Sequence, residues 1–255
     1  VCPAGQTPTN LFFDDLENIT SGNWQDLVAG STNHWDGGAG TPDVYFPNFP
    51  APSGTYQFWG FNFANIGDSA VAMTTNVALP AGARLQFNHS YNVEQEATDF
   101  YDGGVVEYST DGGTTWTDAG ALISAGSVYG GIISIDFDNP LAGRSAFVAD
   151  SLGYAASQLN LGSLVGQNVR FRFRMGTDSS VNDLGWFIDD VRIYTCGASP
   201  ARTLSINDVT RAEGNSGTTA STFTVTLTPA SAETVTVHYT TANGTATAPS
   251  DYATT

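Results

Sequence analysis

The sequence predicts an all-β protein made of antiparallel sheets that pack as a sandwich. Several segments alternate apolar and polar side chains with the period of two that separates the faces of a strand. Thr, Val, Ser, Asn and aromatic residues dominate, 28 glycines punctuate the chain, and long helical patterns are rare. A length of 255 residues accommodates one large β domain and part of a second.

The centre of the predicted sandwich is a β-hairpin over residues 102–116. Its first strand alternates over residues 105–109, and Asp-Gly-Gly at 111–113 supplies residues that tolerate the positive φ of a tight turn. Trp116 is expected to pack back on the returning strand, and Asp-Gly-Gly at 102–104 is expected to form a loop that enters the hairpin.

The other strands follow from the same alternation, and they are expected over residues 11–16, 70–76, 84–94, 169–175 and 186–194. In 169–175, Val, Phe, Phe and Met point one way and three arginines point the other way. Those three arginines (Arg170, Arg172 and Arg174) are expected to pair with nearby carboxylates as a structural ladder. The long segment 119–160 is expected to cross between the sheets.

Charge excludes two classes of partner. The chain has 25 acidic and 8 basic residues, a net charge of −17, so it would repel nucleic acid and anionic lipid. No run of 18 apolar residues exists, which argues against membrane insertion. Of the acids, 19 are Asp and 6 are Glu. Asp in Gly- and Asn-rich loops is a common calcium ligand, whereas a simple role in solubility would not explain the Asp bias.

The two cysteines, Cys2 and Cys196, bracket the first predicted domain. In an exported protein they would form a disulfide, and in a cytosolic one they would be incidental thiols. We favour the disulfide and an extracellular or bacterial cell-surface location. The chain begins at Val1 rather than Met, as a mature chain does after removal of a leader.

An aromatic stretch, residues 44–63, contains eight aromatic residues and three prolines. Aromatic side chains on a proline-stiffened loop can stack on sugar rings or bind another protein. The candidates for such a surface are Tyr45, Phe46 and Phe49. The later aromatics, Trp59, Phe61 and Phe63, are expected to alternate into the core instead.

Four motifs occur together in order: Leu-Glu-Asn at 16–18, the hairpin at 102–116, Thr-Asp at 177–178, and Gly-Trp-Phe-Ile-Asp-Asp-Val at 185–191. In this combination the chain resembles bacterial jelly-roll domains related to MAM and cleaved-adhesin domains, in particular the choice-of-anchor J type. Similar domains follow the catalytic part of secreted metalloproteases of the immune inhibitor A kind. The resemblance implies a two-sheet antiparallel jelly roll, export, often a structural calcium ion, and no enzyme activity.

The expected calcium ligands are Glu17 and Asp189 or Asp190. Glu17 ends the first strand, and the two aspartates lie on the last strand, which comes close to the first in such sandwiches. A second ion is considered near Asp102, at the mouth of the hairpin. The loop before it also carries Glu94, Glu96 and Asp99. Alternatively, Asp189 and Asp190 cap turns and pair with the arginine ladder.

A second unit follows a hinge at residues 197–202. Leu-Ser-Ile-Asn-Asp-Val at 204–209, Glu-Gly-Asn-Ser-Gly at 213–217, Ala-Asn-Gly-Thr-Ala at 242–246 and Ser-Asp-Tyr at 250–252 resemble the opening half of a Calx-beta domain. That resemblance implies an incomplete immunoglobulin-like sandwich, in which Glu213 and Asp251 match acidic positions. Strands are expected over residues 203–209, 221–228 and 234–241. The predicted organisation is therefore 1–196, a linker at 197–202, and 203–255.

Three or four strands cannot cover their own apolar face. We therefore expect either that the chain continues past Thr255 or that a neighbouring subunit supplies strands, and repeated donation would build a fibre.

A catalytic function is not expected. The three histidines, His34, His89 and His238, are scattered, and no nucleophile, zinc-protease or phosphate-loop motif is present. The predicted function is a calcium-stabilised, non-catalytic adhesion or structural module of a bacterial surface or secreted protein, whose partners are protein subunits of the same assembly. The alternatives are a glycan-binding accessory domain and the post-catalytic region of a secreted metalloprotease.

Overall fold

The computed structural model describes residues 2–18, 21–28, 35–36, 51–212, 216–231 and 234–254. The chain divides into two compact units, Val1–Gly197 and Ala198–Thr255. Strands account for most of the regular structure in both units. Within the described ranges, no helix is long and apolar enough to cross a bilayer.

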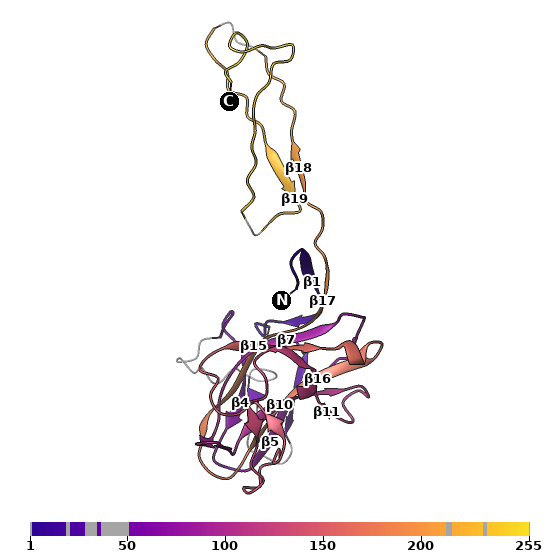
Figure 1. The fold of residues 1–255 in the computed structure, drawn as a ribbon, viewed down its shortest axis with the longest axis vertical. Coiled ribbons are helices and arrows are strands. Elements are labelled where there is room, and N and C mark those ends of the chain that lie inside the picture. Colours follow the sequence, from indigo (N-terminus) through magenta and orange to yellow (C-terminus); the bar gives the residue numbers. More distant parts are fainter. Residues whose placement is uncertain are drawn as a thin grey trace. The chain divides into compact units, whose positions relative to one another are not determined.

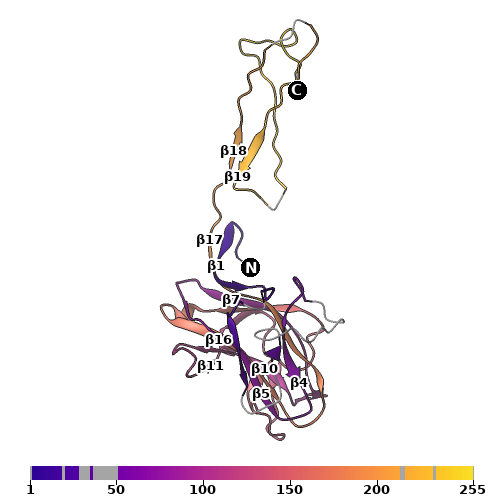
Figure 2. The ribbon, with the colours of Figure 1, turned by 180° about the vertical axis from the view of Figure 1, so that it is seen from behind.

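The first unit contains two large sheets, which Figures 1 and 2 show from opposite sides. The seven-stranded sheet has the order β12-β15-β7-β17-β4-β3, and β1 pairs with β17. Its strands are β1 (Gln6–Asp14), β3 (Trp35–Asp36), β4 (Phe58–Asn62), β7 (Arg84–Asn92), β12 (Ile123–Gly126), β15 (Ala155–Asn160) and β17 (Asp183–Ala198). The pairing of β1 with β17 confirms that the first and last strands of this unit are neighbours.

The six-stranded sheet has the order β11-β10-β16-β5-β2, and β6 pairs with β16. Its strands are β2 (Trp24–Val28), β5 (Gly67–Met73), β6 (Val77–Ala78), β10 (Gly103–Ser109), β11 (Thr117–Asp118) and β16 (Asn168–Thr177). Two small pairs accompany the large sheets: β8 (Gln95–Glu96) with β9 (Asp99–Phe100), and β13 (Gly131–Ile132) with β14 (Ser145–Ala146). Two short 3₁₀ helices are η1 (Gly120–Leu122) and η2 (Gly162–Leu164).

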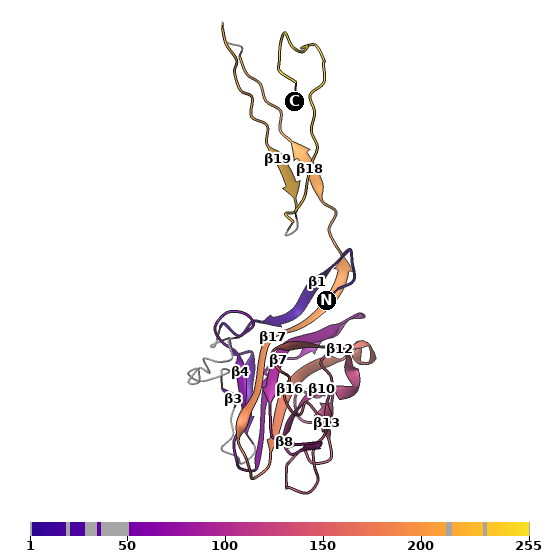
Figure 3. The same ribbon diagram turned by 60° about the vertical axis from the view of Figure 1, so that its left-hand side comes forward.

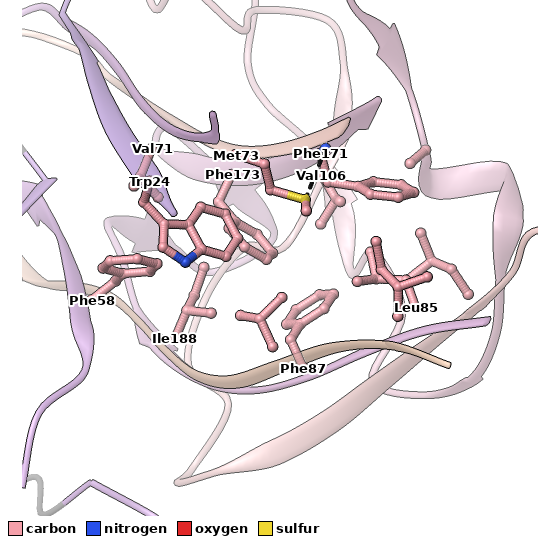
Figure 4. Close-up of a cluster of buried hydrophobic side chains, with 14 of the residues drawn as sticks. Trp24, Phe58, Val71, Met73, Leu85, Phe87, Val106, Phe171, Phe173 and Ile188 are labelled. Atoms are coloured by element: carbon pink, nitrogen blue, oxygen red, sulfur yellow. Dashed lines mark hydrogen bonds between the residues drawn. The ribbon is translucent and has the colours of Figure 1, made fainter. Parts of the chain in front are cut away.

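The two sheets lie face to face (Figure 3), and the larger of two buried apolar clusters contains side chains from both sheets. Phe171 and Phe173 of β16 alternate inward and meet Leu85 and Phe87 of β7 (Figure 4). All four side chains are fully buried. Burial of each contributes roughly 1.5–3 kcal/mol. The prediction of an all-β fold with antiparallel sheets is confirmed.

The central hairpin forms, with a difference at its entrance. β10 pairs with β11, and Gly112 and Gly113 have the positive φ that the turn requires. Gly103 and Gly104 lie in strand β10 rather than in a loop. A Cβ atom on Gly104 would overlap the indole ring of Trp186, so this glycine allows the close packing of the ring on the strand backbone.

The arginine ladder of β16 is confirmed for Arg172 and Arg174, which pair with carboxylates, but not for Arg170. Arg172 Nε lies 2.5 Å from Glu107 Oε2 and Arg174 Nε lies 2.7 Å from Asp68 Oδ1. Arg170 donates to the side chain of Asn76. The guanidinium of Arg172 also lies 4.5 Å from the ring centroid of Trp116, so Trp116 covers the ladder.

Two other predictions have different outcomes. The segment 119–160 does cross between the sheets, because it leaves β11 in one sheet and ends as β15 in the other. Of the three aromatics expected in the core, Phe61 is buried, Trp59 is half-buried and Phe63 is 41% exposed, whereas Phe58 is fully buried in the core. A period of two separates the faces of a strand but does not say which of them is inward.

In the second unit, β18 (Thr203–Ile206) pairs with β19 (Val225–Thr228) in antiparallel register. A strand was expected over residues 234–241, but these described residues form no strand. Apolar side chains are exposed along residues 221–228 and 234–241, namely Phe223, Val225, Val235, Val237 and Tyr239.

Candidate functional site

Glu17 and the adjacent pair Asp189 and Asp190 contact the same short segment, residues 53–56; we call these three acids the first cluster, although their carboxylate oxygens do not all lie within 4.8 Å of one another. Glu17 Oε1 accepts hydrogen bonds from the backbone N–H groups of Thr55 and Tyr56, both at 2.7 Å. Ser53 Oγ donates to Asp190 Oδ1 at 3.0 Å and lies 3.4 Å from Asp189 Oδ2. The structure therefore brings Glu17 and both aspartates to the same short segment.

Local backbone geometry makes this convergence possible. Successive residues of a regular strand point to opposite faces, so Asp189 and Asp190 should diverge. The register of β17 against β7 shifts between Asp189 and Arg192, and Asp190 has a φ of +51°. Such a bulge re-aims side chains, which lets both aspartates reach Ser53.

Burial perturbs the carboxyl of Asp189 in the first cluster. Its side chain is fully buried, and burial raises the pKa of its carboxyl to about 7, although the N–H of Asp190 opposes the rise. Asp190 accepts from Asn88 Nδ2 at 2.9 Å. The alternative prediction that these aspartates pair with the arginine ladder is wrong, because no ion pair between described residues includes them.

A second cluster consists of Glu94, Asp102 and Asp178. One carboxylate oxygen from each residue lies within 4.8 Å of the other two. Their relative exposures are 8%, 0% and 1%. Glu94 follows β7, Asp102 precedes β10 and Asp178 follows β16. Because Gly103 pairs with Gly176, the antiparallel register of β10 and β16 puts Asp102 beside the end of β16.

The hydrogen bonds of Asp102 are uneven. Its Oδ1 accepts from the N–H of Asp178 at 2.7 Å and faces Asn139 Nδ2 at 3.3 Å. Its Oδ2 is buried and has no hydrogen-bond partner among the described residues. Burial, together with the charges of Asp178 and Glu94, raises the pKa of Asp102 to about 8. Burial and the charge of Asp178 also raise the pKa of Glu94.

The sequence pattern predicted an ion near Asp102 and placed Glu94 in the acidic loop before it. It did not indicate Asp178 as a site residue. The signal for Asp178 was the Thr-Asp pair that ends the arginine strand. Glu96 and Asp99, which shared that loop, are exposed in β8 and β9 and are not in the cluster.

The two histidines among the described residues lie in different units of the chain. His89 is fully buried, where burial lowers the pKa of its imidazole to about 3. Trp186 Nε1 donates to His89 Nδ1 at 3.1 Å, and His89 Nε2 lies 2.8 Å from Ser157 Oγ. His238 is exposed in the second unit. His34 lies outside the described residues.

The remaining predicted residues have mixed outcomes. Cys2 and Cys196 are bonded as a disulfide, as expected. The predicted aromatic surface (Tyr45, Phe46 and Phe49) and Glu213 lie outside the described residues. Asp251 accepts a hydrogen bond from the N–H of Thr247 at 2.7 Å, within a turn of the second unit.

Comparisons with known proteins reveal one sequence relative. No protein-family model matches the chain. Bacillopeptidase F of Bacillus subtilis (strain 168) is 28% identical over 182 residues, which are 69% of this chain and 10% of Bacillopeptidase F. The chain therefore spans about a tenth of the length of the curated relative that it matches.

Solved structures with some similarity include cleaved adhesin domains, carbohydrate-binding modules and a glycoside hydrolase domain. The K1 cleaved adhesin domain of Lys-gingipain from Porphyromonas gingivalis W83 is 17% identical, with coverage of 75% of this chain and 99% of that domain and a TM-score of 0.42. The TmCBM61 structure in complex with β-1,4-galactotriose is 13% identical, with coverage of 68% and 88% and a TM-score of 0.37. Likenesses this distant carry no functional argument.

Proposed function

We propose that this chain is a non-catalytic binding and structural module of an exported protein, and that calcium stabilises its sandwich. The observation that carries the proposal is the convergence of Glu17, Asp189 and Asp190 on residues 53–56. An ion held there would join the end of β1, the bulge of β17 and the segment between them.

The donor set suits calcium. All three side chains offer carboxylate oxygens, and calcium takes six to eight oxygen ligands at about 2.3–2.6 Å. The hydrogen bonds from Ser53 N and Oγ to Asp189 Oδ2, at 3.3 and 3.4 Å, are longer than optimal. A bound ion could therefore replace them at little cost. A divalent charge would also offset the burial of the Asp189 carboxylate.

Two further observations support a non-catalytic role outside the cytosol. The buried His89 and Glu107 serve packing and ion pairing: His89 lies between Trp186 and Ser157, and Glu107 pairs with arginines. A disulfide such as Cys2–Cys196 is typical of oxidising compartments. The match to one-tenth of Bacillopeptidase F supports a role as an accessory region of a larger secreted protein. Binding of glycans through Tyr45, Phe46 and Phe49, and assembly with other subunits into a fibre, stay predictions.

Calcium should raise the melting temperature of the full chain relative to chelator. A ligand at 100 times its Kd stabilises the state that binds it by about 2.7 kcal/mol. The matched variants are Glu17→Gln and Asp190→Asn, each of which should bind one calcium ion fewer per chain than the wild type. Asp99→Asn, an exposed acid outside both clusters, is the control and should bind as many ions as the wild type. Retention of every bound ion by Glu17→Gln and Asp190→Asn would exclude the first cluster as a calcium site.

A further inference from the structure

The ends of three strands meet at the second cluster. Glu94 follows β7, whereas Asp102 and Asp178 flank the paired ends of β10 and β16. The polypeptide thus brings three carboxylates within 4.8 Å of one another at almost complete burial. Such an arrangement is costly unless another group compensates the charge, because like charges in a poorly solvated site repel strongly.

No described cation supplies that compensation. The ion pairs of the described residues join Arg144, Arg172 and Arg174 to other acids, namely Glu107, Asp118 and Asp68. The charged groups that act most strongly on Glu94 and Asp102 are themselves carboxylates.

Asp102 Oδ2 shows directly that a partner is needed. The residue is 0% exposed, and this oxygen accepts no hydrogen bond from the described residues. The neighbouring Asn62 is 2% exposed and interacts with the Asp102 carboxyl, but neither its Oδ1 nor its Nδ2 makes a hydrogen bond of good geometry with a described residue. Leaving such buried polar atoms unsatisfied costs about 1–3 kcal/mol each, and more for a charged group.

A proton and a cation are the two candidates for the partner. A proton on Asp102 Oδ2 would neutralise one carboxylate and make one hydrogen bond. A cation would be shared by several oxygens at once, including Asp102 Oδ2, Glu94 and Asp178, and would balance the charge of more than one carboxylate. Ser180 Oγ, 3.3 Å from both Glu94 Oε1 and Asp178 Oδ1, adds another neutral oxygen.

We propose that Glu94, Asp102 and Asp178 form a divalent-cation site of the calcium class, separate from the first cluster. Two oxygens bound to one calcium ion at about 2.3–2.6 Å can lie up to about 5 Å apart, which the observed spacing satisfies. Calcium accepts irregular coordination by flexible side chains, as three acids from three separate strand ends would supply, whereas magnesium demands near-ideal octahedral geometry. The site therefore favours the larger ion.

The test measures the number of calcium ions bound per full chain. Metal is first removed with chelator, the chelator is dialysed away, and calcium chloride is added. Equilibrium dialysis with elemental analysis should find that Asp102→Asn and Asp178→Asn each bind one calcium ion fewer per chain than the wild type. Glu96→Gln and Asp99→Asn, exposed acids of the adjacent β8–β9 pair, should bind as many ions as the wild type. Calcium should also bind this site more tightly than magnesium does.

Stability gives an independent readout. Asp102→Asn removes one of three repelling charges, so its calcium-free form should melt at or above the wild-type temperature, while its stabilisation by calcium should shrink. If Asp102→Asn fails to fold, Glu94→Gln at the most exposed position of the cluster provides the same ion count. Unchanged ion counts in the folded variants of this cluster would overturn the proposal. Glu17→Gln reports on the first cluster alone, so failure of one site is distinguishable from failure of the other.

Discussion

At the scale of single residues, His89 shows how a buried polar side chain acquires one protonation state. The indole N–H of Trp186 can only donate, so His89 Nδ1 must accept. The other nitrogen, Nε2, then carries the hydrogen and donates it to Ser157 Oγ, which in turn donates to the carbonyl oxygen of Ser127. A second proton on the ring would have no acceptor at Nδ1. The chain of donors therefore requires neutral imidazole.

This requirement makes stability depend on pH. Burial lowers the pKa of His89 to about 3 in the folded protein, from 6.5 for an ordinary histidine. Below pH 6.5 the unfolded chain binds a proton that the folded chain does not, so stability falls as the pH falls from about 6.5 towards 3. Each pH unit in that window costs about 1.4 kcal/mol.

His89→Gln should remove this contribution, and the free energy of unfolding should depend less on pH between 6.5 and 4.5. Urea unfolding followed by tryptophan fluorescence measures it, because all five tryptophans lie in the first unit. The exposed His238 of the second unit supplies the control, His238→Gln, which should keep the wild-type slope. Equal slopes for His89→Gln and the wild type would contradict the assignment.

At the scale of elements, the pairing of β10 with β16 determines the outer face of one sheet. Glu107 stands directly opposite Arg172, and Arg144 reaches the same carboxylate from the crossing segment at 2.7 Å. Glu107 is 3% exposed. Burial alone would raise the pKa of its carboxyl, but Arg172 and Arg144 outweigh burial and lower it. One acid thus holds two strands and the crossing segment together.

Glu107→Gln should destabilise the first unit by about 3 kcal/mol, the lower end of the cost of breaking a buried ion pair, since the arginines are partly exposed. The contribution of Glu107 is present above its ordinary pKa and is lost as the pH falls through the lowered value. Denaturant titrations at neutral and acidic pH would measure both effects. For comparison, Asp118→Asn removes the more exposed partner of Arg144 and should cost about 1 kcal/mol or less. If Glu107→Gln lowered the free energy of unfolding by no more than Asp118→Asn does, Glu107 would not be the residue that holds β10, β16 and the crossing segment together.

At the scale of the whole molecule, the disulfide joins the start of the first unit to its last strand. Cys2 and Cys196 are separated by 194 residues, and their bond closes nearly the whole unit into one loop. The pairing of β1 with β17 brings the two ends together independently of the bond.

Replacement of both cysteines by serine should lower the free energy of unfolding by up to about 5 kcal/mol, because a long loop restricts the unfolded chain strongly. The fold should persist at neutral pH, since the sheets and core do not depend on the bond. The urea midpoint, measured by tryptophan fluorescence, is the observable, and a reducing agent should lower it in the wild type but not in the variant. An unchanged midpoint in the variant would show that the ends are held by strand pairing alone.

Much of the fold could be predicted because its signals are local. Alternation over residues 169–175 identified the buried face of β16 and the arginine face, and Asp-Gly-Gly at 111–113 identified the turn. These inferences need only the geometry of a strand and of a turn, which a few adjacent residues determine. The closeness of the first and last strands was expected from the family resemblance instead, and the role of Glu17, Asp189 and Asp190 as calcium ligands stays a prediction.

The sequence by itself therefore determined the fold class, the two faces of β16, the turn at 111–113 and the cysteine pair. Only the tertiary structure decided which face of β4 is inward, that Gly104 supports Trp186, and that Asp178 joins Glu94 and Asp102. The physical reason is that these outcomes depend on the register between strands and on what packs against them. Residues 94 and 178 are far apart in the chain, and no local pattern encodes their distance. Asp102 and Asp178 meet because the start of β10 pairs with the end of β16, and the end of β7 brings Glu94 to them. This arrangement exists only in the folded sandwich.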